Sequence, residues 1–141
     1  MSECVFCAIV AGTAPARMVY SDDHVMGFLD IRPVRPGHTL VIPREHHPDL
    51  AGITSEMGTR LFDAARMIGA ALRSSSIAAD GVNVMINDGR AAFQTVFHTH
   101  VHVVPRHHGD RLSFARGLVM RRDPDPDATV AAVRAAMPEG T

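Results

Sequence analysis

The segment His98-Thr99-His100-Val101-His102-Val103-Val104 constrains the fold of this 141-residue chain more than any other. Successive side chains of a β-strand point to opposite faces. A strand over about 96–104, ended by Pro105, would therefore place the three histidines on one face and Thr99, Val101 and Val103 on the other. One face would carry a ladder of imidazoles, and the other would be apolar enough to pack against a helix.

The remaining segments complete a small mixed domain. Strands are predicted over residues 18–21, 24–30, 38–42 and 82–86, and the first two form a hairpin. The longest periodic element is a helix that begins after Thr54 or Ser55 and presents an apolar face. Its members are Met57, Leu61, Ala64, Ala65, Ile68 and Leu72. Short helices are expected over 4–10 and, capped by Asp127, over 128–137.

Hairpins dominate this pattern, and only one long helix interrupts them. We therefore predict an α+β fold with about five antiparallel strands, rather than a parallel array. Edge strands of so small a sheet need cover, which a homodimer could supply.

Length and composition exclude several classes of protein. A chain of 141 residues predicts one domain over 1–141. No run approaches the roughly 18 apolar residues of a membrane helix, and the first residues lack the basic start of a signal peptide. We therefore expect a cytoplasmic protein without membrane contact. The formal net charge of -1 disfavours nucleic acid as a partner. All 14 cationic side chains are arginines, which excludes catalysis by a lysine amine.

The three histidines favour chemistry at phosphorus. A neutral imidazole is a good nucleophile when a partner holds the proton on its other nitrogen. A covalent phospho-imidazole would divide a difficult substitution into two steps. The alternatives are an exposed strand face, an adventitious metal site or a stack of half-buried rings. Strict alternation within an otherwise hydrophobic strand favours the catalytic interpretation.

Two cysteines near the N-terminus raise a separate question of metal binding. Cys4 and Cys7 supply half of a tetrahedral zinc site, and His46 or His47 together with His98 would complete a Cys2His2 set. Such a zinc ion would be structural and would not activate water. The alternatives are two free thiols or a redox pair, and the redox pair lacks its usual βαβ context.

Residues 4–106 resemble the histidine triad (HIT) superfamily of nucleotide hydrolases and transferases, with 107–141 as a C-terminal extension. Besides the three histidines, the matching motifs occur in the family's order and spacing. They are Phe28-Leu29-Asp30-Ile31, Gly37-His38-Thr39-Leu40-Val41-Ile42-Pro43 with His46 beyond, Asn87, and Gln94-Thr95-Val96-Phe97. The resemblance implies an α+β homodimer whose five-stranded antiparallel sheets pair, with a purine nucleoside monophosphate bound to each subunit.

The resemblance also implies roles for individual residues. His100 would attack the α-phosphorus of an AMP derivative, and water would hydrolyse the nucleotidyl-histidine. His102 would contact the phosphate and the leaving group, and His38 would support the ladder that begins at His98. Asp30 would accept the ribose hydroxyls. Around the phosphate would lie Asn87, Gln94 and Thr95, and around the base Val5, Phe6, Ile9, Phe28, Ile31 and Leu40. Some family members bind zinc through a set that corresponds here to Cys4, Cys7, His46 and His98. No organic cofactor is implied.

Two features leave the substrate open. Phe93 stands where the family usually has glycine, which narrows the backbone conformations available beside the phosphate. Arginines and histidines after the triad could meet a polyphosphate, although a solvated basic loop is the simpler interpretation. They are Arg106, His107, His108, Arg111 and Arg116. The expected activity is hydrolysis or transfer on AMP-X nucleotides, such as phosphoramidates or adenylates. The alternatives are cleavage of dinucleoside polyphosphates by water or phosphate, and nucleotide binding without turnover. The intact histidine triplet argues against binding without turnover.

Overall fold

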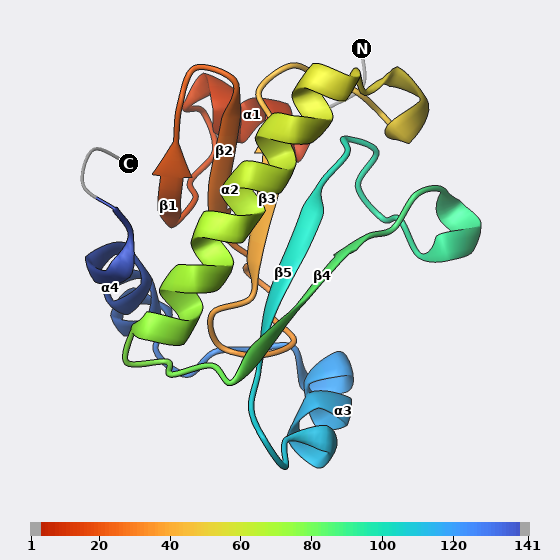
Figure 1. Cartoon of the computed structure of the whole chain (residues 1–141). Helices are drawn as coiled ribbons and strands as arrows, with labels where there is room; N and C mark the ends of the chain where they lie inside the picture. The colour runs from red at the N-terminus through yellow and green to blue at the C-terminus, as the bar shows by residue number, and fades with distance from the viewer. Residues whose placement is uncertain (1–3, 139–141) are drawn as a thin grey trace.

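A computed structural model describes residues 4–138 of the chain, and its centre is one five-stranded sheet. The strands are β1 (Met18–Ser21), β2 (Val25–Leu29), β3 (Thr39–Pro43), β4 (Gly81–Ile86) and β5 (Val101–Arg106). Their order is β1-β2-β3-β5-β4, and every neighbouring pair is antiparallel (Figure 1). The predicted α+β fold with an antiparallel sheet is confirmed. The ends of the domain predicted over 1–141 lie outside the described residues.

The long helix α2 (Ser55–Ser74) covers one face of the sheet. It begins as predicted, because Thr54 Oγ1 accepts a hydrogen bond from the Met57 N–H. Its apolar face, which includes Ile68 and Leu72, joins Val101 and Val103 of β5 in one buried cluster. Burying each such side chain contributes about 1.5 to 3 kcal/mol. The valine face of the histidine segment is therefore the core face.

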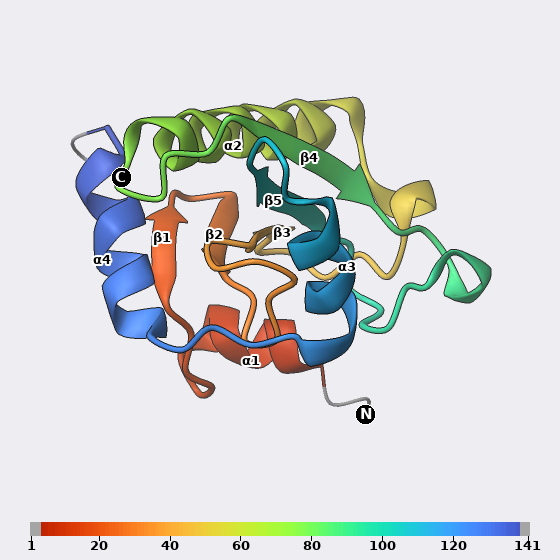
Figure 2. The same cartoon turned by 90° about the horizontal axis from the view of Figure 1, so that it is seen from below.

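A shorter helix, α1 (Val5–Ala11), covers the opposite face of the sheet (Figure 2). Its Phe6 and Ile9 side chains pack on Phe28 of β2 and Leu40 of β3 in a second buried cluster. Leu40 is paired in register with His102, so the histidine face of β5 is the one that α1 covers. The candidate site thus lies between the sheet and the N-terminal helix.

The predicted fifth strand was wrong at both ends. β5 begins at Val101, rather than near residue 96, and continues through Pro105 to Arg106. Proline is tolerated there because pairing with β3 stops at Val103. The Arg106 carbonyl accepts the Asp80 N–H on the β4 side, so the backbone of Pro105 faces the side that β3 no longer reaches.

The C-terminal extension also differs from the prediction. It holds a helix that the sequence did not indicate, α3 (Arg111–Met120), with no buried residue. Exposed apolar side chains such as Leu118 and Val119 give α3 no periodic pattern to recognise. The final helix, α4 (Pro126–Ala136), starts earlier than predicted, because Asp125, rather than Asp127, caps it by accepting the Ala128 N–H. Two short 3-10 turns, Leu50–Gly52 and Arg90–Ala92, complete the described elements.

No helix in the described part of the chain is long and apolar enough to cross a membrane.

Candidate functional site

Four histidines gather along the pairing of β3 with β5. His102 lies on β5, His98 and His100 lie in the irregular segment before it, and His38 lies immediately before β3. The ring centroids of His100 and His102 are 4.9 Å apart, and those of His38 and His102 are 5.2 Å apart. The sequence therefore predicted the cluster, although the ladder is not one continuous strand.

One side-chain and one backbone hydrogen bond hold the segment before β5, in place of sheet pairing. The pairing of β5 with β3 extends only to Val41, and β3 itself ends at Pro43. The Pro43 carbonyl accepts a hydrogen bond from the buried ring of His98 at 2.8 Å. The Thr99 N–H donates to the carbonyl of His47 at 2.7 Å. These contacts hold the first two histidines without a β-ladder.

Hydrogen bonds fix which nitrogen of His38 and of His102 carries the proton. The Val34 N–H donates to Nδ1 of His38 at 3.0 Å, so Nδ1 is unprotonated and Nε2 carries the proton. Nε2 of His38 lies 2.9 Å from Nδ1 of His102, which must then accept. The proton of neutral His102 is left on Nε2. That atom is buried and has no hydrogen-bond partner among the described residues, so it can donate to a ligand.

His100 has the complementary arrangement. Its Nδ1 lies 2.8 Å from the carbonyl oxygen of His98, which can only accept, so Nδ1 carries the proton. Nε2 of His100 therefore has the lone pair. The edge-to-face contact with Phe6, with centroids 5.2 Å apart, holds the ring in place. His100 and His102 thus offer a nucleophilic nitrogen and an N–H donor from adjacent rings.

Burial keeps these rings neutral. It lowers the pKa of His38 to about 3, assisted by the positive charge of Arg121 and by His100. It also lowers the pKa of His102 to about 4, with His38 and His100 as further causes. The pKa values of His98 and His100 are lowered too, again chiefly by burial. Near pH 7 the four imidazoles are neutral, as their hydrogen bonds require.

The other nitrogen of His98 faces a cluster of metal-ligand atoms. Because Nε2 of His98 donates to Pro43, its Nδ1 has a free lone pair. That atom lies 3.4 Å from Sγ of Cys4, 3.6 Å from Sγ of Cys7 and 3.2 Å from Nδ1 of His46. Ligand atoms around tetrahedral zinc are about 3.3 to 3.8 Å apart, given its bond lengths of about 2.0 to 2.3 Å. The separations from His98 are therefore close to those that such an ion requires, and all four ligand atoms lie within 4.8 Å of one another.

Two further observations support that fit. His47, the alternative ligand, lies 3.1 Å from the carboxylate of Glu45 and is not in the cluster. Burial raises the pKa of the Cys7 thiol, and the hydrogen bond with Cys4 and the charge of Cys4 raise it further. A cation would supply the stabilisation that its thiolate needs.

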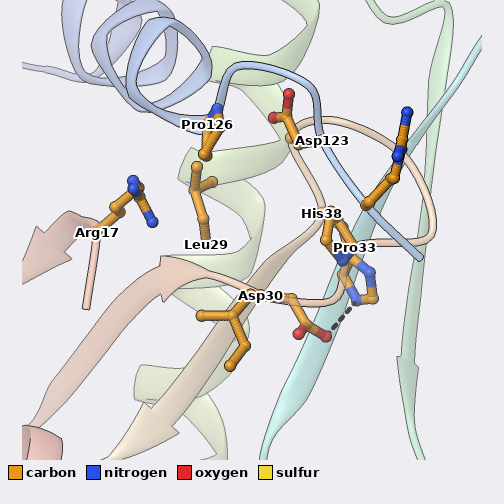
Figure 3. A pocket seen from close by; sticks show the side chains of 10 residues that line it. Arg17, Leu29, Asp30, Pro33, His38, Asp123 and Pro126 are labelled. Carbon is orange, nitrogen blue, oxygen red and sulfur yellow. Dashed lines mark ion pairs between the residues drawn. The ribbon is translucent and has the colours of Figure 1, made fainter. Parts of the chain in front are cut away.

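Asp30, directly after β2, lies near the nitrogen of His38 that contacts His102. One carboxylate oxygen accepts the Arg32 N–H at 2.9 Å, and the other lies 3.7 Å from Nε2 of His38 and 3.7 Å from Nη2 of Arg121. Figure 3 shows the carboxylate turned toward the imidazole of His38 at the edge of a pocket of about 120 Å³. Asp30 therefore has one oxygen available for a ligand.

The predicted base-pocket residues fall into two groups. Phe6, Ile9, Phe28 and Leu40 are buried together under α1, whereas Val5 is half exposed and Ile31 is 81% exposed. Only the first four belong to one buried hydrophobic cluster. Their contact with a base stays a prediction.

The predicted phosphate residues differ in burial. Gln94 is buried, and its amide is used within the loop: Oε1 accepts the Gly89 N–H, and Nε2 donates to the carbonyls of Pro48 and Val96. Thr95 is exposed and Asn87 is half-buried. Gln94 braces this loop, and phosphate contacts of the three residues stay a prediction.

Phe93 is 83% exposed and lies in the left-handed region, with φ of 71°. A non-glycine residue there costs about 1 kcal/mol or more, which explains why glycine suits this position.

Sequence reasoning missed Arg121. It considered Arg111 and Arg116, which are exposed on α3, and the structure instead places Arg121 beside Asp30. The two residues are 91 positions apart, and no local pattern connects them.

Known proteins resemble this chain over most of its length. Residues 11–109 match the family model described as the HIT domain. An uncharacterised HIT-like protein of Mycobacterium tuberculosis is 48% identical over 134 residues, which cover 95% of this chain and 92% of the relative. An adenylylsulfatase of Arabidopsis thaliana is 32% identical over 136 residues, covering 94% and 68%. The crystal structure of a zinc-bound histidine triad family protein from Mycobacterium smegmatis is 51% identical, covers 95% of this chain and 92% of its own, and has a TM-score of 0.88.

The neutral His38 ring predicts a loss of stability in acid. Unfolded His38 takes up a proton near its ordinary pKa of 6.5, whereas the folded ring stays neutral down to about 3. Its contribution is therefore complete above pH 6.5 and is lost progressively as the pH falls through this window. We expect wild type to lose a few kcal/mol more than His38→Asn between about pH 7 and about pH 4, measured by urea unfolding.

Asparagine keeps an acceptor for Val34 and a donor for His102 but does not titrate. Acid effects at other groups occur in both proteins, so their difference isolates His38. Equal pH dependence in the two proteins would contradict the assignment.

Proposed function

The chain belongs to the HIT family, a superfamily of nucleotide-binding proteins and hydrolases, and from this premise we propose that it cleaves AMP-X nucleotides through a covalent intermediate on His100. X is the group joined to the α-phosphate of AMP. It is an amine in a phosphoramidate, and in an adenylate it is the group to which AMP is joined. The single observation that supports this proposal is the pair of proton positions on His100 and His102. One ring presents a lone pair and its neighbour presents an N–H.

Each histidine has one task in the proposed reaction. Nε2 of His100 attacks the α-phosphorus, so that a P–N bond forms and the bond from phosphorus to X breaks. Nε2 of His102 gives its proton to X as it leaves. Water then attacks the same phosphorus, the P–N bond breaks, and the proton of the water returns to His102. The products are AMP and HX, and both rings regain their starting states.

The surrounding groups support these steps. The carbonyl of His98 accepts from Nδ1 of His100 and stabilises the positive charge that this ring gains when Nε2 bonds to phosphorus. The Asp30 oxygen that lies beside Arg121 and His38 accepts a ribose hydroxyl. A buried N–H donor helps most when X is a poor leaving group such as an amine. This favours AMP-X compounds over dinucleoside polyphosphates, whose phosphate leaving groups need less protonation.

We propose that Cys4, Cys7, His46 and His98 hold a zinc ion, as the donor set and its separations support. Four protein ligands leave no open position, so the ion would act structurally. It would fix α1 and the segment that carries His100. No step of the reaction passes through it. No organic cofactor, a single domain and a cytoplasmic location remain our predictions for this chain.

We also propose that the chain forms a homodimer through β4. This strand lies at an edge of the sheet, and its Val84, Met85 and Ile86 side chains are between 39% and 48% exposed. Pairing of two such edges would satisfy their backbone groups and cover these side chains. A purine nucleotide would bind to each subunit, and we expect neither nucleic acid nor a membrane as a partner.

Turnover by wild type and His100→Ala tests the function. The substrates are adenosine phosphoramidate, an aryl ester of AMP, and tri- and tetraphosphate-bridged diadenosines. We expect wild type to release AMP most efficiently from the phosphoramidate, and His100→Ala to lose at least about a thousandfold in kcat while still binding AMP. His108→Ala is the matched control, because that histidine side chain is 93% exposed and outside the site. Turnover by His100→Ala at the wild-type rate would exclude the nucleophile.

Elemental analysis of protein purified without added metal tests the zinc site. We expect about one zinc per chain in wild type and much less in Cys7→Ser, because loss of one of four ligands weakens a closed site. His47→Ala, which alters the neighbouring histidine outside the cluster, should retain the metal. Metal-free wild type with two freely titrating thiols would remove zinc from the proposal.

Sedimentation velocity tests the dimer. We expect wild type to be dimeric and a Val84→Lys, Ile86→Lys double variant to be monomeric, because lysine on an edge strand opposes pairing. Leu112→Lys on the exposed surface of α3 should remain dimeric. A monomeric wild type at micromolar concentration would refute the interface.

A further inference from the structure

Helix α3 contributes nothing to the hydrophobic core, and yet it is held tightly in place. None of its residues is buried, whereas α4 inserts Val130 and Val133 into the main cluster. Figure 1 places α3 below the sheet, at the end where the chain turns between β2 and β3. At its start, the guanidinium of Arg106 bonds to both oxygens of Asp110 at 2.9 Å and lies 3.9 Å from the ring centroid of Phe114. Something other than apolar burial therefore accounts for its position.

The first contact between α3 and the loop from β2 to β3 is made by Gly117. A Cβ atom at this position would collide with the backbone carbonyl of Val34. The φ angle of Gly117 is not positive, so the position needs glycine for space and not for backbone freedom. Helix and loop backbone are in direct contact here, and no larger residue fits.

The second contact is made by Arg121, which ends α3 in a left-handed conformation with φ of 46°. Its Nε donates to the carbonyl of Arg32 at 2.9 Å, and Nη2 lies 3.7 Å from Asp30. Together, Gly117 and Arg121 hold the loop at Val34 and at Arg32, two residues apart.

Val34 is the residue whose N–H sets the proton position on His38. Without that donor, Nδ1 of His38 can take the proton, and Nε2 then becomes an acceptor toward His102. Nδ1 of His102 must donate in return, which leaves Nε2 of His102 without its proton. The N–H that faces the ligand is lost, although no histidine has changed.

We propose that α3 is a positioning element for the leaving-group donor, and that Gly117 and Arg121 act through Val34 and His38 on the proton of His102. This inference rests on the proposed function for the role of that proton, but the proton position itself can be measured without turnover. Gly117 and Arg121 are positioning residues, because neither touches the reacting atoms.

Gly117→Ala, with Gly58→Ala as its matched control, tests the proposal. Gly58 lies in α2, and a Cβ there meets nothing within 4 Å. Alanine favours a helix over glycine at either position, so helix stability alone predicts that both variants keep wild-type properties. We expect Gly58→Ala to match wild type and Gly117→Ala to move the His102 proton from Nε2 to Nδ1, measured by ¹⁵N NMR of histidine-labelled protein.

Leaving-group dependence provides the second measurement. A phosphoramidate needs a proton on its amine, whereas a nitrophenyl ester of AMP expels an anion that does not. We expect Gly117→Ala to lose at least about tenfold in kcat/KM on the phosphoramidate and about twofold or less on the ester. A general loosening of the site would reduce both rates equally.

A Gly117→Ala protein with the wild-type proton position, or with equal losses on both substrates, would overturn the proposal. If this variant does not fold, Arg121→Ala decides by the same two measurements, because it releases the loop without adding an atom. An inactive wild type would contradict the proposed function, and the NMR comparison would still decide whether α3 sets the proton on His102.

Discussion

The hydrogen bond from Nε2 of His98 to the carbonyl of Pro43 is the interaction on which the site depends. It places the proton of this buried ring on Nε2 and so leaves Nδ1 facing Cys4, Cys7 and His46. It also joins the segment before β5 to the end of β3, where the ladder between these strands has stopped. The carbonyl of the same His98 then accepts from His100. One residue therefore organises both the metal-ligand cluster and the nucleophilic ring.

One face of the sheet packs into the main hydrophobic core, and the other carries the histidines of the candidate site. Val101 and Val103 of β5 pack under α2, where apolar burial stabilises the fold, while the alternate residue His102 faces the α1 side. A one-residue shift in register would place the imidazole in the core and a valine in the site. The burial that stabilises the fold thus also determines which nitrogen atoms face a ligand.

Local pattern predicted most of the fold. Strand alternation, the apolar face of α2 and the turn residues were sufficient for the sheet, the long helix and the clustering of the histidines. Cys4 and Cys7 were sufficient for the idea of a metal site, but geometry was needed to choose His46 over His47. These features are encoded by residues close together in the chain.

The errors have a common physical cause, since each depends on contacts between distant segments. The start of β5 depends on the end of β3, where the Pro43 carbonyl accepts from the ring of His98. Helix α3 has no apolar period because its contacts are a glycine against backbone and an arginine against a carbonyl.

The position of the metal-ligand cluster has a consequence for the unfolded chain. Cys4 and His98 are 94 residues apart, so any ion that joins them closes a loop over most of the protein. A covalent cross-link across a loop of about 100 residues lowers the entropy of the unfolded ensemble by an amount equivalent to about 4 to 5 kcal/mol. An ion bound here would restrict the random coil in the same sense. The metal-ligand cluster would then affect the unfolded state, in which the histidine site has not yet formed.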